Sequence, residues 1–132
     1  MALINSPLRY PGGKSALSDF LSQVILENNL EGGVYAEPYC GGAGAALNLL
    51  FAEYVEKIIL NDADRSIYAF WWSVLHQSGK LIELIDKTPV NIEHWQMQKE
   101  IYNNQKKHSL LKVGFATFFL NRCNRSGILL KA

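Results

Sequence analysis

The fold is decided by two neighbouring stretches, YAEPYCGGAG at residues 35–44 and IILND at residues 58–62. The first predicts a strand that runs into a glycine turn and then opens a helix, and the second predicts an apolar strand that ends in Asp62. Glycines let the backbone turn tightly and approach a ligand without an intervening Cβ atom. A carboxylate at the tip of the next strand can accept hydrogen bonds from both ribose hydroxyls. This layout indicates a site for an adenosine-containing cofactor.

Two related nucleotide-binding patterns fit the chain poorly. A dinucleotide fingerprint needs a third glycine, but GGAG is followed here by Ala45, Ala46 and Leu47. The run YPGGKS at residues 10–15 ends like a phosphate-binding P-loop, yet the first glycine of that pattern would fall on Leu8 and no apolar strand precedes it. A purely structural interpretation stays open, in which the glycines only pack a helix tightly against a sheet.

Length and composition predict one ordinary globular domain. The chain has 132 residues, of which 48% are apolar and 19% charged, and this is enough to bury a core. The net charge of +1 gives no strong overall attraction to nucleic acid, so any polyanion site must be local. Two cysteines, no secretory leader and no long apolar run predict reduced thiols, a cytoplasmic location and no membrane partner. No metal site is expected, because the histidines lack ligand spacing with one another or with the cysteines.

Hydrophobic periodicity predicts the order of the elements. After residue 14, a helix is expected to bury one face formed by Leu17, Phe20, Leu21, Val24 and Ile25. Strands are predicted at 34–37 and 55–60, the second one buried, with a helix of small residues at about 43–53 between them. Further helices are predicted from about Ala63, from Gly79 to before Pro89, from the N-cap Asn91 to about Gln105, and from Ser109 onward.

This order implies an α/β fold with a parallel sheet. Two strands are too few for an open doubly wound sheet, which usually carries about five or six. We therefore expect an incomplete sheet with flanking helices, whose remaining strands lie beyond Ala132. The sequence stops directly after a predicted loop at 121–127 and a strand-like apolar segment at 128–130.

Three segments in this order resemble the Dam-like, D12-class DNA adenine-N6 methyltransferases: PLRYPGGK at 7–14, EPYCGGAG at 37–44 with the dipeptide at 61–62, and FFLNRCNRSG at 118–127. The resemblance covers essentially the whole chain. It implies a Rossmann-like methyltransferase fold that uses S-adenosylmethionine, with residues 1–132 forming only the N-terminal part of the cofactor-binding domain. The target-recognition segment and the later catalytic motif of that family are absent from this sequence.

The resemblance also implies roles for individual residues. Tyr10 and Lys14 would lie against the methionine end of the cofactor, where an aromatic face suits a sulfonium cation and a lysine suits a carboxylate. The amino-acid part and the ribose would be surrounded by the turn residues Glu37, Pro38, Tyr39, Gly41, Gly42 and Gly44. Asp62 would hold the ribose hydroxyls. It has an alternative role as the N-cap of the next helix, for which Asp64 competes.

In the family, the segment at 121–127 leads into the part that recognises double-stranded DNA. The resemblance therefore implies that Arg122, Asn124 and Arg125 face DNA phosphates or bases. Lys106 and Lys107 are a weaker DNA candidate. The aromatic cluster of Tyr68, Phe70, Trp71 and Trp72 has helical spacing, which favours core packing over base stacking.

The family motif Asp-Pro-Pro-Tyr, which accepts the adenine amino hydrogens and stacks on the flipped base, is missing here. The only prolines are Pro7, Pro11, Pro38 and Pro89, and no two are adjacent. No catalytic residue is therefore expected in this chain, which should be inactive alone. One alternative is a catalytically silent cofactor- or DNA-binding module that works with a partner chain supplying the missing C-terminal half. A dehydrogenase on the same fold is a further alternative.

Overall fold

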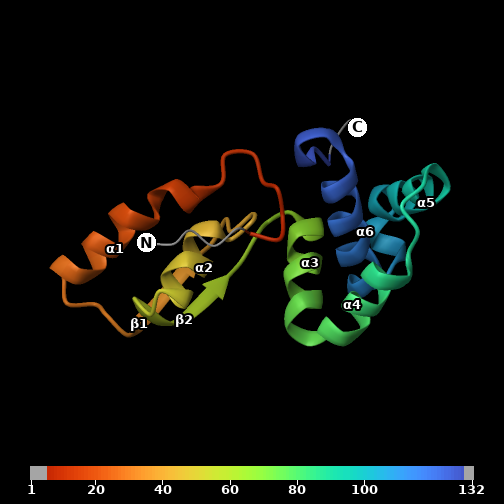
Figure 1. Ribbon diagram of the computed structural model, residues 1–132. Helices are drawn as coiled ribbons and strands as arrows, with labels where there is room; N and C mark the ends of the chain where they lie inside the picture. The colour runs from red at the N-terminus through yellow and green to blue at the C-terminus, as the bar shows by residue number, and fades with distance from the viewer. Residues whose placement is uncertain (1–5, 130–132) are drawn as a thin grey trace. The chain divides into compact units, whose positions relative to one another are not determined.

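The computed structural model describes residues 6–129 and divides the chain into two compact units, Met1–Asp62 and Ala63–Ala132 (Figure 1). The sequence predicts a single domain instead, because no glycine-, proline- or serine-rich linker marks this boundary. The first unit contains the parallel strands, and all regular elements of the second unit up to residue 129 are helices. Each unit is described by itself below.

The first unit is built on a parallel strand pair. Strand β1 (Gly33–Glu37) pairs with β2 (Val55–Leu60), and the register brings Glu37 opposite Leu60. Helix α2 (Gly44–Phe51) connects the strands and packs against both of them. A helix is the usual crossover between neighbouring parallel strands. The predicted strand–helix–strand order of an α/β fold is therefore confirmed, with bounds within one or two residues at the strands.

The first helix buries a different face from the one that the sequence predicts. A short 3₁₀ turn, η1 (Lys14–Leu17), leads into α1 (Ser18–Glu27), whose buried residues are Ser18 and Ser22. Phe20 of the predicted apolar face is 63% exposed. The prediction is wrong because the small polar side chains of α1, not its apolar ones, pack against α2. There, Asn48 Nδ2 donates a hydrogen bond of 2.9 Å to the hydroxyl of Ser18. The Ser18 hydroxyl thus accepts a hydrogen bond from a buried amide, which a leucine at this position could not do.

One face of the strand pair is open among the described residues. Val34 of β1 is 60% exposed and Ile59 of β2 is 49% exposed, while Glu37 on the opposite face is buried. The prediction that residues 55–60 form a buried strand is therefore wrong in this chain, where only Val55 of that strand is buried. Strands of parallel sheets are buried when helices cover both faces. Here α1 and α2 leave one face uncovered.

The second unit is a set of four helices: α3 (Arg65–His76), α4 (Ser78–Lys87), α5 (Ile92–Asn103) and α6 (Leu110–Cys123). Three of them begin at capping side chains, since Asp64, Asn91 and Ser109 accept hydrogen bonds from backbone N–H groups two or three residues later. The predicted cap at Asn91 and the predicted start at Ser109 are confirmed. A 3₁₀ turn, η2 (Gln105–Lys107), joins α5 to α6.

Helices α3 and α6 form the core of this unit. Phe70 and Trp71 are buried, as core packing predicts, and the Phe70 ring stacks on Phe118 with centroids 5.9 Å apart. Tyr68 is exposed, so core packing does not hold for the whole aromatic cluster. A Cβ atom added at Gly114 of α6 would lie 2.5 Å from the carbonyl oxygen of Ala69 in α3. The two helices therefore touch backbone to backbone.

The end of the described chain is more helical than predicted. Residues 121–123 belong to α6 rather than to a loop, and a 3₁₀ turn, η3 (Arg125–Gly127), follows. Ile128 and Leu129 are not in a strand, and Leu130 lies outside the described residues. The amide of Asn121 helps to close this turn by donating to the carbonyl oxygen of Gly127 at 3.1 Å. Side-chain bonds of this kind compete with extended structure.

Candidate cofactor site

The site begins where β1 leaves the sheet. The chain turns sharply between Glu37 and α2, with positive φ angles of 49° at Gly41 and 52° at Ala43. Ala43 directly precedes the first residue of α2 in this left-handed conformation, and its N–H group bonds to the carbonyl oxygen of Cys40 at 2.6 Å. A left-handed conformation is unfavourable for alanine, so the surrounding turn must hold it.

The N-terminal loop (residues 6–13) packs directly on this turn. A Cβ atom at Gly41 would lie 2.7 Å from Cε1 of the Tyr10 ring, and one at Gly42 would lie 2.9 Å from the hydroxyl oxygen of Ser6. Such distances leave no room for a side chain at either glycine. The Tyr10 ring thus packs against the backbone of the glycine turn. The loop at 6–13 and the turn at 37–44, two segments that the sequence singles out, therefore lie side by side.

Gly44 makes a third close approach, this time to the 3₁₀ turn that follows the loop. A Cβ atom at Gly44 would lie 2.9 Å from Cβ of Ser15. Ser15 was not singled out as a site residue, and its position directly after Lys14 is the only signal that the sequence offers for it. The close contact positions Lys14 above the turn.

Lys14 joins the two sides of the site. Its ammonium lies 3.2 Å from Oε1 of Glu37 and donates a hydrogen bond to the carbonyl oxygen of Tyr39. Glu37 is only 3% exposed, whereas Tyr39 is 70% exposed. A lysine ammonium has three donors, so these two contacts leave one in reserve. The sequence-based prediction had Lys14 facing the ligand alone, and the structure adds the ion pair with Glu37.

The carboxylate of Glu37 has unused acceptor capacity. Oε2 has no hydrogen-bond partner among the described residues and Oε1 has only the ion pair with Lys14, although both atoms are buried. Buried carboxylate oxygens normally have such partners, since an unpaired buried acceptor costs on the order of 1–3 kcal/mol or more. A ligand that brings a positively charged donor would satisfy them.

Asp62 closes the other edge of the turn. Its Oδ2 accepts a hydrogen bond of 2.8 Å from the N–H group of Gly41. The neighbouring Asn61 adds two bonds to the same turn: its carbonyl oxygen accepts from the N–H group of Cys40 at 2.9 Å, and its Nδ2 donates to the carbonyl oxygen of Pro38 at 3.1 Å. The sequence analysis gives Asn61 no role, although it belongs to the motif. Its hydrogen bonds connect the end of β2 to the turn that follows β1.

The competition between Asp62 and Asp64 for the helix cap is settled by geometry. Oδ1 of Asp64 accepts from both the N–H group and the hydroxyl of Ser66, at 2.8 and 2.7 Å. Asp64 is therefore the N-cap of α3. Asp62 belongs to the glycine turn instead, next to the position where a ribose is expected.

The electrostatics of the turn keep Cys40 protonated. Burial, followed by the negative charges of Asp62 and Glu37, raises the pKa of the Cys40 thiol to about 11. Burial also raises the pKa of Tyr35, with a smaller effect of Glu37. A thiol with such a pKa is a poor nucleophile at neutral pH. Cys40 is buried in the turn.

All nine residues predicted to bind the cofactor belong to the first unit: Tyr10, Lys14, Glu37, Pro38, Tyr39, Gly41, Gly42, Gly44 and Asp62. Short contacts, hydrogen bonds and one ion pair link six of them into one constellation: Tyr10, Lys14, Glu37, Tyr39, Gly41 and Asp62. Pro38 joins it through Asn61. Their roles toward a ligand stay predictions.

The residues predicted to face DNA lie in the second unit and differ in exposure. Arg122 and Arg125 are exposed, but Asn124 is buried. The amide of Asn124 accepts from Nε1 of Trp95 at 2.8 Å and donates to the carbonyl oxygen of Ile128 at 2.7 Å. Asn124 thus has a structural function in this turn, which leaves the two arginines as the accessible groups.

Within residues 6–129, no group of three or more potential ligand side chains is arranged to hold a metal ion. No helix in that range combines the length and the apolar character that crossing a bilayer requires.

The family described as D12 class N6 adenine-specific DNA methyltransferase matches residues 10–129 of the 132. A comparison with curated proteins gives no match. The matched range contains every residue of the constellation described above and the turn at the end of α6.

Proposed function

The chain belongs to the D12 class of N6 adenine-specific DNA methyltransferases, and from this premise we propose that its first unit binds S-adenosylmethionine. Members of the class use this cofactor to methylate adenine in DNA, and the class has a Rossmann-like fold. Residues 1–132 are, in this proposal, the N-terminal part of the cofactor-binding domain of such an enzyme.

The proposal is carried by the ion pair between the partly exposed Lys14 and the buried Glu37, beside the glycine turn. The amino-acid end of S-adenosylmethionine bears an ammonium and a carboxylate. Glu37 offers two buried acceptor oxygens to the ammonium, and Lys14 keeps one donor for the carboxylate. One negative and one positive protein group side by side therefore complement a zwitterion, and charge-assisted hydrogen bonds are the stronger kind.

The rest of the constellation suits the other parts of the same ligand. The Tyr10 ring offers an aromatic face to the sulfonium, an interaction worth about 0.5–2 kcal/mol. Asp62 would accept from the ribose hydroxyls, with Pro38, Tyr39, Gly41, Gly42 and Gly44 lining the turn. The cofactor itself supplies the methyl group, and these residues only bind and orient it.

Binding of labelled S-adenosylmethionine to the full chain, by equilibrium dialysis, tests this assignment. Asp62→Ala should raise Kd about tenfold or more, because hydrogen bonds to a charged group contribute about 1.5–3 kcal/mol. Asp62→Asn keeps an acceptor for the Gly41 N–H group and should lose less. Asp19→Ala, an exposed carboxylate on α1, is the matched control. Equal Kd values for Asp62→Ala and Asp19→Ala would remove Asp62 from the site.

Methyl transfer is a separate part of the proposal. The sequence contains no Asp-Pro-Pro-Tyr, so we expect no multiple turnover on adenine by this chain alone. Labelled cofactor incubated with the chain and duplex DNA should leave the DNA unlabelled beyond background. Sustained transfer to adenine N6 without a second polypeptide would refute this expectation.

The alternative of a silent module that works with a partner chain has one observation in its favour. The open face of the strand pair exposes Val34 and Ile59, and α1 exposes Phe20. Exposed apolar groups that gather on one unit are typical of a surface covered by further protein. Arg122 and Arg125 would then contact double-stranded DNA from the second unit, as phosphate-binding side chains.

A further inference from the structure

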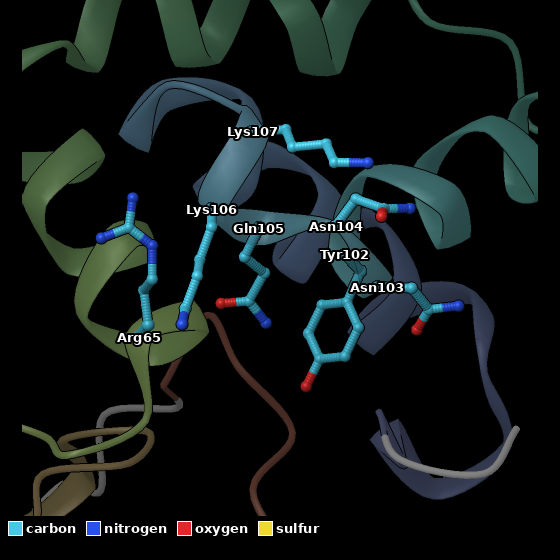
Figure 2. A pocket seen from close by; sticks show the side chains of 7 residues that line it. All are labelled: Arg65, Tyr102, Asn103, Asn104, Gln105, Lys106 and Lys107. Carbon is cyan, nitrogen blue, oxygen red and sulfur yellow. The ribbon is translucent and has the colours of Figure 1, made fainter.

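The second unit contains an open basic pocket that the proposed cofactor site does not use. Its volume is about 420 Å³, and it is lined by Arg65 at the start of α3 and by the residues 102–107 at the end of α5 and in η2. Figure 2 shows Arg65, Lys106 and Gln105 around the same space, with Tyr102 beside them, while Lys107 extends away from Arg65 and Lys106.

The lining has the chemistry of an anion site. Three of its seven residues are cations, Arg65, Lys106 and Lys107, and the others are Tyr102, Asn103, Asn104 and Gln105. No carboxylate from residues 6–129 lines it. None of the three cations forms an ion pair with another described residue, although the whole chain has a net charge of only +1. Like charges gathered without a counter-charge repel one another, and a bound anion would relieve this repulsion.

The shape of the pocket favours a polymer over a small molecule. Arg65, Asn103, Lys106 and Lys107 are all exposed, so the space opens widely to solvent. Sites for small ligands usually bury most of the ligand surface and are mainly apolar. A phosphodiester backbone needs only a shallow contact, in which a guanidinium and an ammonium meet one phosphate group.

We propose that this basic pocket binds a phosphate group of the DNA backbone through Arg65 and Lys106. The inference rests on the proposed function, because it takes DNA as the partner of the chain. It adds a contact on α3 and η2 to the arginines at the end of α6. A contact to a phosphate would position the duplex without reading its sequence.

The test is the binding of a fluorescein-labelled 12-base-pair duplex to the full chain, followed by anisotropy at several salt concentrations. Lys106→Gln should weaken binding about three- to tenfold at low salt, and the slope of log K against log salt should fall in magnitude by about 0.9 for one lost phosphate contact. Arg65→Gln should act in the same direction. Lys80→Gln, an exposed lysine on α4 outside the pocket, is the matched control and should change neither value.

Calorimetric titration with pyrophosphate distinguishes the sources of the phosphate. If pyrophosphate binds in a Lys106-dependent manner while the pocket variants hold DNA as tightly as the wild type, the pocket serves a small phosphorylated molecule and the DNA assignment is overturned. Pocket variants that behave like Lys80→Gln in both assays overturn the anion site altogether. A wild-type chain that binds S-adenosylmethionine but no duplex overturns this inference and leaves the cofactor assignment standing. Circular dichroism of each variant checks that the fold is intact.

Discussion

At the scale of single residues, Gly41 is the position where the backbone and the site depend on each other most. Its φ angle is 49°, and an added Cβ atom would lie 2.7 Å from the Tyr10 ring. Gly41→Ala therefore meets two costs, a left-handed alanine of about 1–2 kcal/mol and overpacking of about 1–3 kcal/mol. We expect a loss of about 2–4 kcal/mol in the free energy of unfolding, measured by circular dichroism during urea denaturation.

Gly32 provides the control for this prediction. Its φ angle is 71°, but no atom lies within 4 Å of an added Cβ. Gly32→Ala should show the cost of the backbone conformation alone, and the difference between the two variants measures the contact with Tyr10. If both variants lose the same stability, Tyr10 does not pack on the turn in solution.

The residue scale also shows what sequence reasoning could reach. Motif chemistry points to Gly41 and Asp62, the family resemblance adds Tyr10 and Glu37, and the structure brings these four residues together. The sequence does not predict the ion pair between Lys14 and Glu37, because the two residues are far apart in the chain and both were assigned contacts with the cofactor rather than with each other.

At the scale of elements, the closest contact in the second unit is the crossing of α3 and α6. Gly114 lets α6 touch the backbone of α3, since an added Cβ atom would lie 2.5 Å from both the Ala69 carbonyl oxygen and the Ser73 hydroxyl. Gly114→Ala should separate the helices and lower the free energy of unfolding by about 1–3 kcal/mol, despite the better helix propensity of alanine. The three tryptophans, Trp71, Trp72 and Trp95, all belong to this unit, so tryptophan fluorescence during urea unfolding reports on it.

Gly79 in α4 is the matched control for the helix crossing. It has nothing within 4 Å of an added Cβ, so Gly79→Ala should be neutral or raise stability by up to about 1 kcal/mol. A Gly114→Ala variant as stable as Gly79→Ala would show that the close helix crossing is absent.

Elements were predicted well where the signal is local and poorly where it depends on a neighbour. The strands and the caps at Asn91 and Ser109 follow from apolar runs and from side-chain chemistry next to them. The buried face of α1 cannot be predicted in this way, because it depends on the packing of Ser18 against Asn48 of α2. Periodicity identifies a helix, but packing decides which stripe is covered.

At the scale of the whole molecule, the sequence predicts an α/β chain. The structure adds a division into two compact units, which the composition of the sequence does not reveal. The boundary between the units falls beside Asp62, within a short connection that has no linker character. The open sheet face and the missing Asp-Pro-Pro-Tyr agree with the proposal that the first unit holds the cofactor without completing a catalytic site.

The most direct test of the central claim is a titration of S-adenosylmethionine into the uniformly ¹⁵N-labelled full chain, followed by amide chemical shifts. The account predicts saturable shifts confined to residues 10–15, 37–44 and 61–62, and a large loss of affinity in Glu37→Gln, which removes the charge of the buried carboxylate. Saturation without shifts in these segments, or no saturable change at millimolar cofactor, would contradict it.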